Sequence, residues 1–163
     1  MTRGRRKSWR CCGKSRSTSP APPPRGRFWS CARAWVSHGF NVLPVAVGAT
    51  VASEPASHPF NGEPLDTPES SRLPLAVYAE WCAMYPNHNA LILPSSAGFV
   101  VFVVAPNLLE WAVVSLGPTP FRVCAPDGAT QLWYRGDAET SRVMPGIEVF
   151  GRGGGVLAPG SLG

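Results

Sequence analysis

A strand that ends without an acid is the first chemical feature of this sequence. The run FVVFVV, residues 99–104, predicts a strand buried on both faces, and Pro106 turns the chain directly after it. In many α/β enzymes the end of such a strand carries the acid that does the chemistry. Here Val103, Val104 and Ala105 stand at that place, so any acid-dependent reaction needs carboxylates from elsewhere in the chain.

Cysteine, histidine and serine do not supply an alternative reactive centre. The five cysteines are an odd number without a C-x-x-C pair, which argues against a zinc site, and Cys82 and Cys124 lie in apolar surroundings that predict small buried side chains. The three histidines lack metal-ligand spacing, and His38 beside Gly39 predicts a helix end. No G-x-S-x-G elbow or G-x-x-x-x-G-K loop is present, which leaves no basis for a hydrolase or a P-loop protein.

Charge divides the chain into two parts. Residues 1–27 hold nine basic residues and no acid, whereas residues 28–163 hold six arginines against ten acids. The serines and prolines of the first part predict a disordered arm, and its arginines favour contact with DNA or RNA through counterion release. Three other interpretations stay open: a solvated tail, a targeting peptide, or upstream sequence from a misassigned start codon. Residues 28–163 are expected to form one domain.

A cytoplasmic location without a membrane span is expected. The apolar stretch 97–116 is long enough to span a bilayer, but Pro106, Asn107 and Glu110 lie at its centre. The basic start of the chain runs into prolines, with no apolar region typical of a secretory signal. Reduced thiols fit the same compartment.

The elements expected to position these residues are short. Helices are predicted over 29–36, 75–84 and 108–116, and strands over 40–45, 90–93, 99–104, 121–125, 130–135, 146–150 and 156–159. A Ser/Gly turn at 95–98 predicts a hairpin between the second and third strands, and Asn107 with Glu110 predicts a capping box. Residues 48–73 predict a long loop. The order gives a mixed α+β domain whose sheet is largely antiparallel.

Several strings, in this order and spacing, resemble the bifunctional DNA primase/polymerase domain of the archaeo-eukaryotic primase superfamily. The family opens with a helix and a segment GfpVfPv, continues with a Trp-bearing helix and P..N, and then shows GlvVlDvD, TPsGGxHlyyr and giDirgdGGyvvaPgS. The corresponding strings here are HGFNVLPV (38–45), EWCAMYPNHNALIL (80–93), GFVVFVVA (98–105), APDGATQLWYR (125–135) and GIEVFGRGGGVLAPGS (146–161). The resemblance covers about residues 29–163 and implies a primase-like fold with an RRM-like core.

The resemblance also implies a nucleotidyl-transfer site that this chain has largely lost. The two acids that would hold divalent metals fall on Val103 and Ala105, and the nucleotide-binding histidine falls on Gln131. Only the third acidic position keeps a carboxylate, as Glu148. One glutamate cannot hold two metal ions, so Glu148 is the sole candidate catalytic residue and no metal ligand set is expected.

Binding is the property that the resemblance leaves intact. Gln131 can hydrogen-bond a phosphate or sugar, and Arg135 and Arg152 lie beside the positions that line the family's nucleotide site. Trp133 and Tyr134 offer a stacking face for a base, although strand alternation equally puts one of them into the core.

The resulting expectation is a primase/polymerase-like protein of DNA replication that binds nucleotides or single-stranded or primer-template DNA without catalysis. No cofactor is expected, and Mg²⁺ or Mn²⁺ is needed only by an active enzyme. Three alternatives stay open: an active enzyme with relocated ligands, for which Asp127 and Asp137 are the candidates; a small protein-interaction module; and the product of a decaying gene. The family commonly continues beyond the point where PGSLG ends this chain, so a longer parent protein also stays open.

Overall fold

The computed structural model describes residues 26–49, 64–67, 69, 72–119, 121–125 and 128–162. The predicted basic arm, apart from its last two residues, lies outside this part of the chain, as do Asp127 and most of the predicted loop 48–73. Statements about the fold and the site below concern the described residues.

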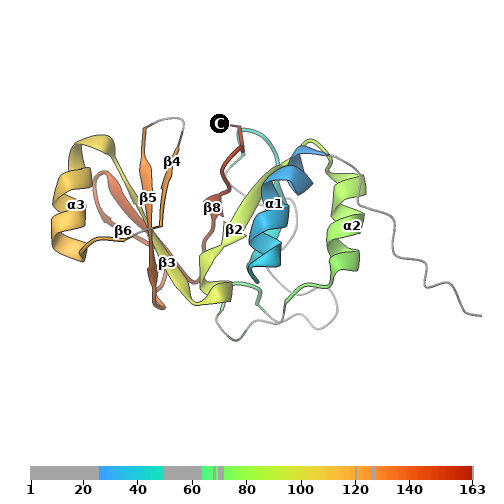
Figure 1. The fold of residues 1–163 in the computed structure, drawn as a ribbon, viewed down its shortest axis with the longest axis horizontal. Coiled ribbons are helices and arrows are strands. Elements are labelled where there is room, and N and C mark those ends of the chain that lie inside the picture. Colours follow the sequence, from blue (N-terminus) through green and yellow to red (C-terminus); the bar gives the residue numbers. More distant parts are fainter. Residues whose placement is uncertain are drawn as a thin grey trace, which may run out of the picture.

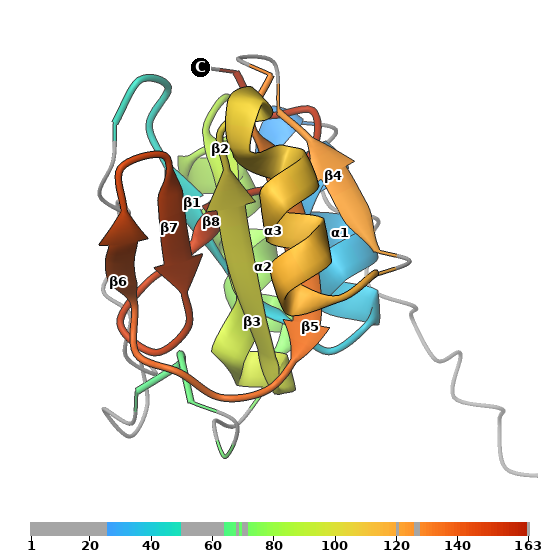
Figure 2. The same cartoon turned by 90° about the vertical axis from the view of Figure 1, so that its left-hand side faces the viewer.

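Two antiparallel sheets form the fold. The first sheet has the strand order β1-β2-β8 and the second has the order β4-β5-β3-β7-β6, with every pairing between named strands antiparallel. Three α-helices and two 3-10 helices complete it (Figures 1 and 2). The elements are α1 (Arg27–Ser37), β1 (Asn41–Val45), α2 (Leu75–Met84), β2 (Asn89–Leu93), η1 (Pro94–Ala97), β3 (Phe99–Val104), η2 (Pro106–Leu108), α3 (Leu109–Leu116), β4 (Arg122–Cys124), β5 (Thr130–Arg135), β6 (Ser141–Met144), β7 (Ile147–Phe150) and β8 (Val156–Leu157). The expected α+β class with antiparallel strands is confirmed.

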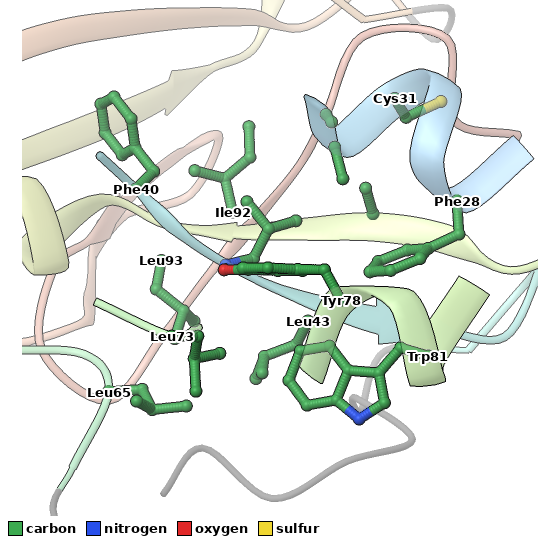
Figure 3. Close-up of a cluster of buried hydrophobic side chains, with 14 of the residues drawn as sticks. Phe28, Cys31, Phe40, Leu43, Leu65, Leu73, Tyr78, Trp81, Ile92 and Leu93 are labelled. Carbon is green, nitrogen blue, oxygen red and sulfur yellow. The ribbon is translucent and has the colours of Figure 1, made fainter. Parts of the chain in front are cut away.

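The first sheet is covered by α1 and α2. Figure 3 shows side chains from both helices and from β1 and β2 meeting in one buried cluster, which includes Phe28, Tyr78, Trp81 and Ile92. The hydroxyl of Tyr78 accepts a hydrogen bond from the backbone N–H of Val42 at 3.2 Å. Because β1 is an edge strand of its sheet, this contact satisfies a donor that no neighbouring strand pairs with.

The central strands of the second sheet carry packed side chains on both faces. Side chains alternate along a strand, so Val104, Leu132 and Ile147 share one face of the sheet and pack around Ala112 of α3. Figure 2 shows α3 lying over this sheet. The opposite face packs toward the first sheet. There the indole of Trp133 stacks on that of Trp35 from α1, with ring centroids 4.9 Å apart.

The predicted hairpin between the second and third strands is wrong. Pro94 starts the 3-10 helix η1, and Gly98 follows it with φ 72°, a conformation that glycine adopts without strain. This turn sends β2 and β3 into different sheets, where β2 pairs with β1 and β8, and β3 pairs with β5 and β7.

The capping box and one burial prediction are also wrong. Asn107 lies inside η2, and Leu108 is the N-cap of α3 without a side-chain hydrogen bond, because Pro106 has already begun a tighter turn. Cys124 is exposed, since β4 is an edge strand, whereas Cys82 is buried as expected. Sequence reasoning missed β6, whose residues are all exposed and show no apolar alternation.

None of the helices in the described ranges is both long enough and apolar enough to cross a bilayer.

Candidate functional site

Three strands of the second sheet place Val103, Gln131 and Glu148 side by side. Val103 on the central strand β3 is in register with Gln131 on β5 and with Glu148 on β7. Residues directly opposite each other in an antiparallel pair point to the same face, with Cβ atoms about 5 Å apart. We call these three residues the β3 row; its side chains lie on the face opposite to α3.

A cavity of about 350 Å³ opens at one end of the β3 row. Ala105 lies at its wall just after β3, and its N–H donates to the carbonyl oxygen of Gly146 at 2.8 Å. Gly146 has φ 85° in the turn between β6 and β7, which is a conformation that favours glycine. The walls are formed by Val103, Ala105, Ala129, Arg142, Pro145, Gly146 and Glu148.

Glu148 is the single carboxylate among the residues that line this cavity, and it is ion-paired. Arg142, opposite Glu148 on β6, donates to Glu148 Oε1 from its Nε at 3.2 Å and from a terminal nitrogen at 2.8 Å. A metal ion at this carboxylate would have to displace the guanidinium. The positions of Val103 and Ala105 offer it no further oxygen ligand from their side chains.

The relocated-ligand alternative finds no second acid here. Asp137 makes a two-pronged ion pair with Arg152, through the Arg152 Nε at 2.8 Å and through a terminal nitrogen. Across the part of the chain that the structure describes, no three His, Cys, Asp or Glu side chains come close enough to hold a metal ion. Asp127 lies outside that part.

Gln131 is buried and turned toward the end of the chain. It is 6 % exposed, and its Nε2 donates to the carbonyl oxygen of Leu157 on β8 at 3.2 Å. Its Oε1 is buried without a hydrogen-bond partner within the described residues. Gln131 also lines a larger, mostly apolar cavity of about 600 Å³ with Val123, Cys124, Ala125 and residues 157–162.

The two candidate stacking residues have other roles. Trp133 is 2 % exposed and packs among Trp35, Phe40 and Phe121, so it has no free face for a base. Tyr134 is half-buried on the other face of the sheet, where its hydroxyl donates to the carbonyl oxygen of Gly117 at 2.6 Å. The stacking role is therefore wrong for Trp133, and the alternation of strand β5 explains both positions.

The two candidate arginines differ in their availability. Arg135 is exposed at the end of β5, with its guanidinium carbon 5.2 Å from the centroid of the Phe99 ring. Arg152 is ion-paired with Asp137, which raises the pKa of Arg152 through hydrogen bonding and charge attraction. Arg135 is the better phosphate ligand of the two because its charge is not already neutralised.

Sequence reasoning missed three arginines. Arg142 could have been found from the Pro145-Gly146 turn, since a hairpin around that turn puts Arg142 opposite Glu148. Arg33 and Arg72 line a third cavity, of about 420 Å³, beside α1 and α2. No sequence pattern links these two positions, because only the packing of α1 beside the segment before α2 brings both to one cavity.

Comparisons with protein-family models, with curated proteins and with solved structures find no match. The resemblance to primase/polymerase domains consequently depends on the strings of this sequence.

Proposed function

We propose that this chain is a primase/polymerase-like domain that binds nucleotides or single-stranded DNA and does not transfer nucleotides. The proposal includes a role in DNA replication and a cytoplasmic location. Other proteins or domains supply the further activities that replication requires. Divalent metal is not part of the proposed binding.

The single observation that carries the proposal is the β3 row. The resemblance assigns a metal-binding acid, a nucleotide-binding histidine and a third acid to three strings that are well separated in sequence. In the structure these positions, Val103, Gln131 and Glu148, are direct neighbours on one face of one sheet. Strings that matched by coincidence would have no reason to converge on one row.

The chemistry of the same row argues against catalysis. Two-metal nucleotidyl transfer needs carboxylates shared between ions about 3.5 to 4 Å apart, and the row offers one glutamate. That glutamate is already paired with Arg142 at 2.8 Å. A valine and an alanine at the other ligand positions leave an apolar wall where metal oxygens would be required.

Anion binding is the property that the charges support. Arg135 and Arg142 both lie at the second sheet, and Arg142 lines the 350 Å³ cavity together with Glu148. A phosphate can compete with an exposed carboxylate for a guanidinium, because such surface ion pairs contribute only about 0 to 1 kcal/mol. Within the described residues the Arg135 guanidinium is not paired with a carboxylate, so a phosphate can bind it without displacing one.

The test combines a catalytic assay with a binding assay. Primer extension and de novo primer synthesis are measured with Mg²⁺ or Mn²⁺, and binding to labelled oligothymidylate is followed by fluorescence anisotropy across a salt series. We expect no extension, and salt-dependent binding that weakens in Arg135→Ala. Arg122→Ala is the matched control, because Arg122 is an exposed arginine of the same sheet that bonds to the carbonyl oxygen of Thr119. Extension that Glu148→Ala abolishes would overturn the proposal.

A protein-interaction module is favoured by one observation as an alternative function. The outer face of α3 exposes Trp111 and Val114, which are 52 % and 80 % exposed and lie three residues apart on one side of the helix. An exposed indole next to an exposed valine is typical of an interaction surface. Self-association that Trp111→Lys abolishes, without any DNA binding by the wild-type chain, would support this alternative and contradict the proposal above.

A further inference from the structure

A cavity of about 420 Å³ lies beside α1 and α2, on the part of the molecule built around the first sheet. Figure 1 shows the two helices side by side over that sheet. The cavity is lined by Trp29, Arg33, Val36, Ser37, Phe40, Asn41, Arg72, Leu73, Leu75 and Tyr78. None of these residues belongs to the β3 row or to the cavity at its end. We propose that this second cavity binds a nucleotide, with its phosphate at the two arginines and its base on the aromatic wall.

Two arginines give this cavity a positive charge. Among the described residues, Arg33, Arg72 and Arg135 have no carboxylate or hydrogen-bond acceptor as a partner. Four other arginines bond to backbone carbonyl oxygens or to carboxylates: Arg27 to Asn87, Arg122 to Thr119, Arg142 to Glu148 and Arg152 to Asp137. Arg135 contacts the ring of Phe99. Two of the three arginines without an acceptor in the described part of the chain therefore line one cavity, and a guanidinium is the side chain best suited to a phosphate.

Within the described residues, the two acids that precede Arg72 in sequence interact with groups outside the cavity. The Asp66 carboxylate accepts a hydrogen bond from the backbone N–H of Gly153. The negative charge of Glu69 helps to raise the pKa of Arg152. The residues that line the cavity include no acid. The guanidinium of Arg72 lies against Gly39, at the C-terminal end of α1, where a Cβ atom would collide with it. The described lining of the cavity therefore presents two positive charges, Arg33 from α1 and Arg72 from the segment before α2.

The shape and the apolar wall are the second argument. Trp29 is half-buried, its ring centroid is 6.4 Å from that of Tyr78, and Phe40 and Val36 continue the apolar surface. A cavity of this volume with an apolar wall and a few charged groups is typical of a small-molecule site. A flat base can contact the aromatic rings while the phosphate reaches the arginines. Inorganic phosphate alone would leave the apolar wall unused.

Two sources of such a ligand share the same chemistry: a free nucleotide, and one unit of a single strand. The probes that separate them are thymidine monophosphate and a twelve-residue oligothymidylate, with thymidine as the probe that lacks phosphate. Titration calorimetry measures the binding of thymidine monophosphate and of thymidine, and fluorescence anisotropy measures the binding of the oligothymidylate. The proteins compared are wild type, Arg33→Gln, Arg72→Gln and the control Arg122→Gln. Thermal melts of each variant establish that it is folded.

We expect Arg33→Gln and Arg72→Gln each to weaken the binding of thymidine monophosphate by at least about 10-fold, since each removes a charge-assisted hydrogen bond. Arg122→Gln should leave it unchanged, and thymidine should bind more weakly than thymidine monophosphate. If a single strand is the natural ligand, each of the two substitutions also reduces the slope of log affinity against log salt concentration for the oligothymidylate by about one.

The outcomes separate this inference from the proposed function. Binding that Arg135→Ala weakens and that Arg33→Gln and Arg72→Gln do not would overturn the inference and leave the proposed function standing. The reverse pattern would support the inference and contradict the role of Arg135 in binding. Equal binding of thymidine and thymidine monophosphate by folded wild type would overturn the role of the two arginines.

Discussion

Raising the pH from 8 to 11 should destabilise the fold through one phenol, that of Tyr78. Its side chain is 1 % exposed, and its hydroxyl accepts a hydrogen bond from the N–H of Val42. Burial raises the pKa of Tyr78 from 10.0 to about 12, and the hydrogen bond from Val42 opposes that shift only in part. The folded chain consequently keeps a proton that the unfolded chain loses.

The sign and the magnitude follow from this difference in proton binding. Below pH 10 the phenol is protonated in both states, so its contribution to stability is fully present. Between pH 10 and 12 the unfolded chain ionises first, and the free energy of unfolding falls with a limiting slope of about 1.4 kcal/mol per pH unit. Relative to pH 8, the loss at pH 11 is about 1.4 kcal/mol.

Urea unfolding of wild type and Tyr78→Phe at pH 8, 9, 10 and 11 measures this term. At pH 8 the variant should be less stable by about 1 to 3 kcal/mol, because the N–H of Val42 loses its acceptor. The difference between the two proteins should then narrow by about 1.4 kcal/mol at pH 11, since other alkaline titrations affect both alike. Curves that stay parallel over the whole pH range would refute the assignment of the buried phenol.

Three further predictions concern the site and the packing. The double substitution Val103→Asp with Ala105→Asp should create a Mn²⁺ site beside Glu148, so that Mn²⁺ at ten times its Kd stabilises the variant by about 1.4 kcal/mol and raises its Tm by about 3 to 6 °C, and wild type shows no such shift; equal melting with and without Mn²⁺ would contradict the assigned site. Gly151→Ala should lower the Tm or prevent folding, because the new Cβ would collide with the backbone carbonyl oxygen of Ala138, and an unchanged melting curve would be inconsistent with this packing. In the native protein a maleimide should modify Cys124 faster than the two buried cysteines of the described chain, whose pKa values burial raises; peptide mass spectrometry gives the rates, and equal rates would count against the exposed edge strand.

Local patterns predicted most helices and strands, because their causes are local. The helix 75–84 and the strands 99–104 and 130–135 have the predicted bounds, since proline, glycine and β-branched runs mark their ends directly in the sequence. The exposed strand β6 was missed because it buries no apolar face that a pattern could show. The pairing of β2 and β3 was wrong because strand partners are chosen by long-range packing, which the short Ser/Gly turn does not reveal.

The sequence also predicted only part of the candidate site. The resemblance named Gln131 and Glu148, and the register places them next to Val103. It did not indicate that Gln131 would be buried against the end of the chain or that Arg142 would pair with Glu148, because both contacts depend on segments folding back across the sheet. Arg33 and Arg72 lie still further from any sequence signal, since one is on a helix and the other precedes one.

The stack of Trp35 on Trp133 has a consequence for how the molecule can move. Trp35 lies on α1, which packs on the first sheet, and Trp133 lies on β5 of the second sheet. The stack therefore connects the two halves of the molecule, each of which is one sheet with its helices. A hinge rotation of one half against the other would separate the rings, expose their stacked faces to water and forfeit about 0.5 to 1.5 kcal/mol of ring–ring interaction in addition to the apolar burial. Closure of the two halves around a ligand is thereby opposed. The stack therefore favours one fixed arrangement of the two halves.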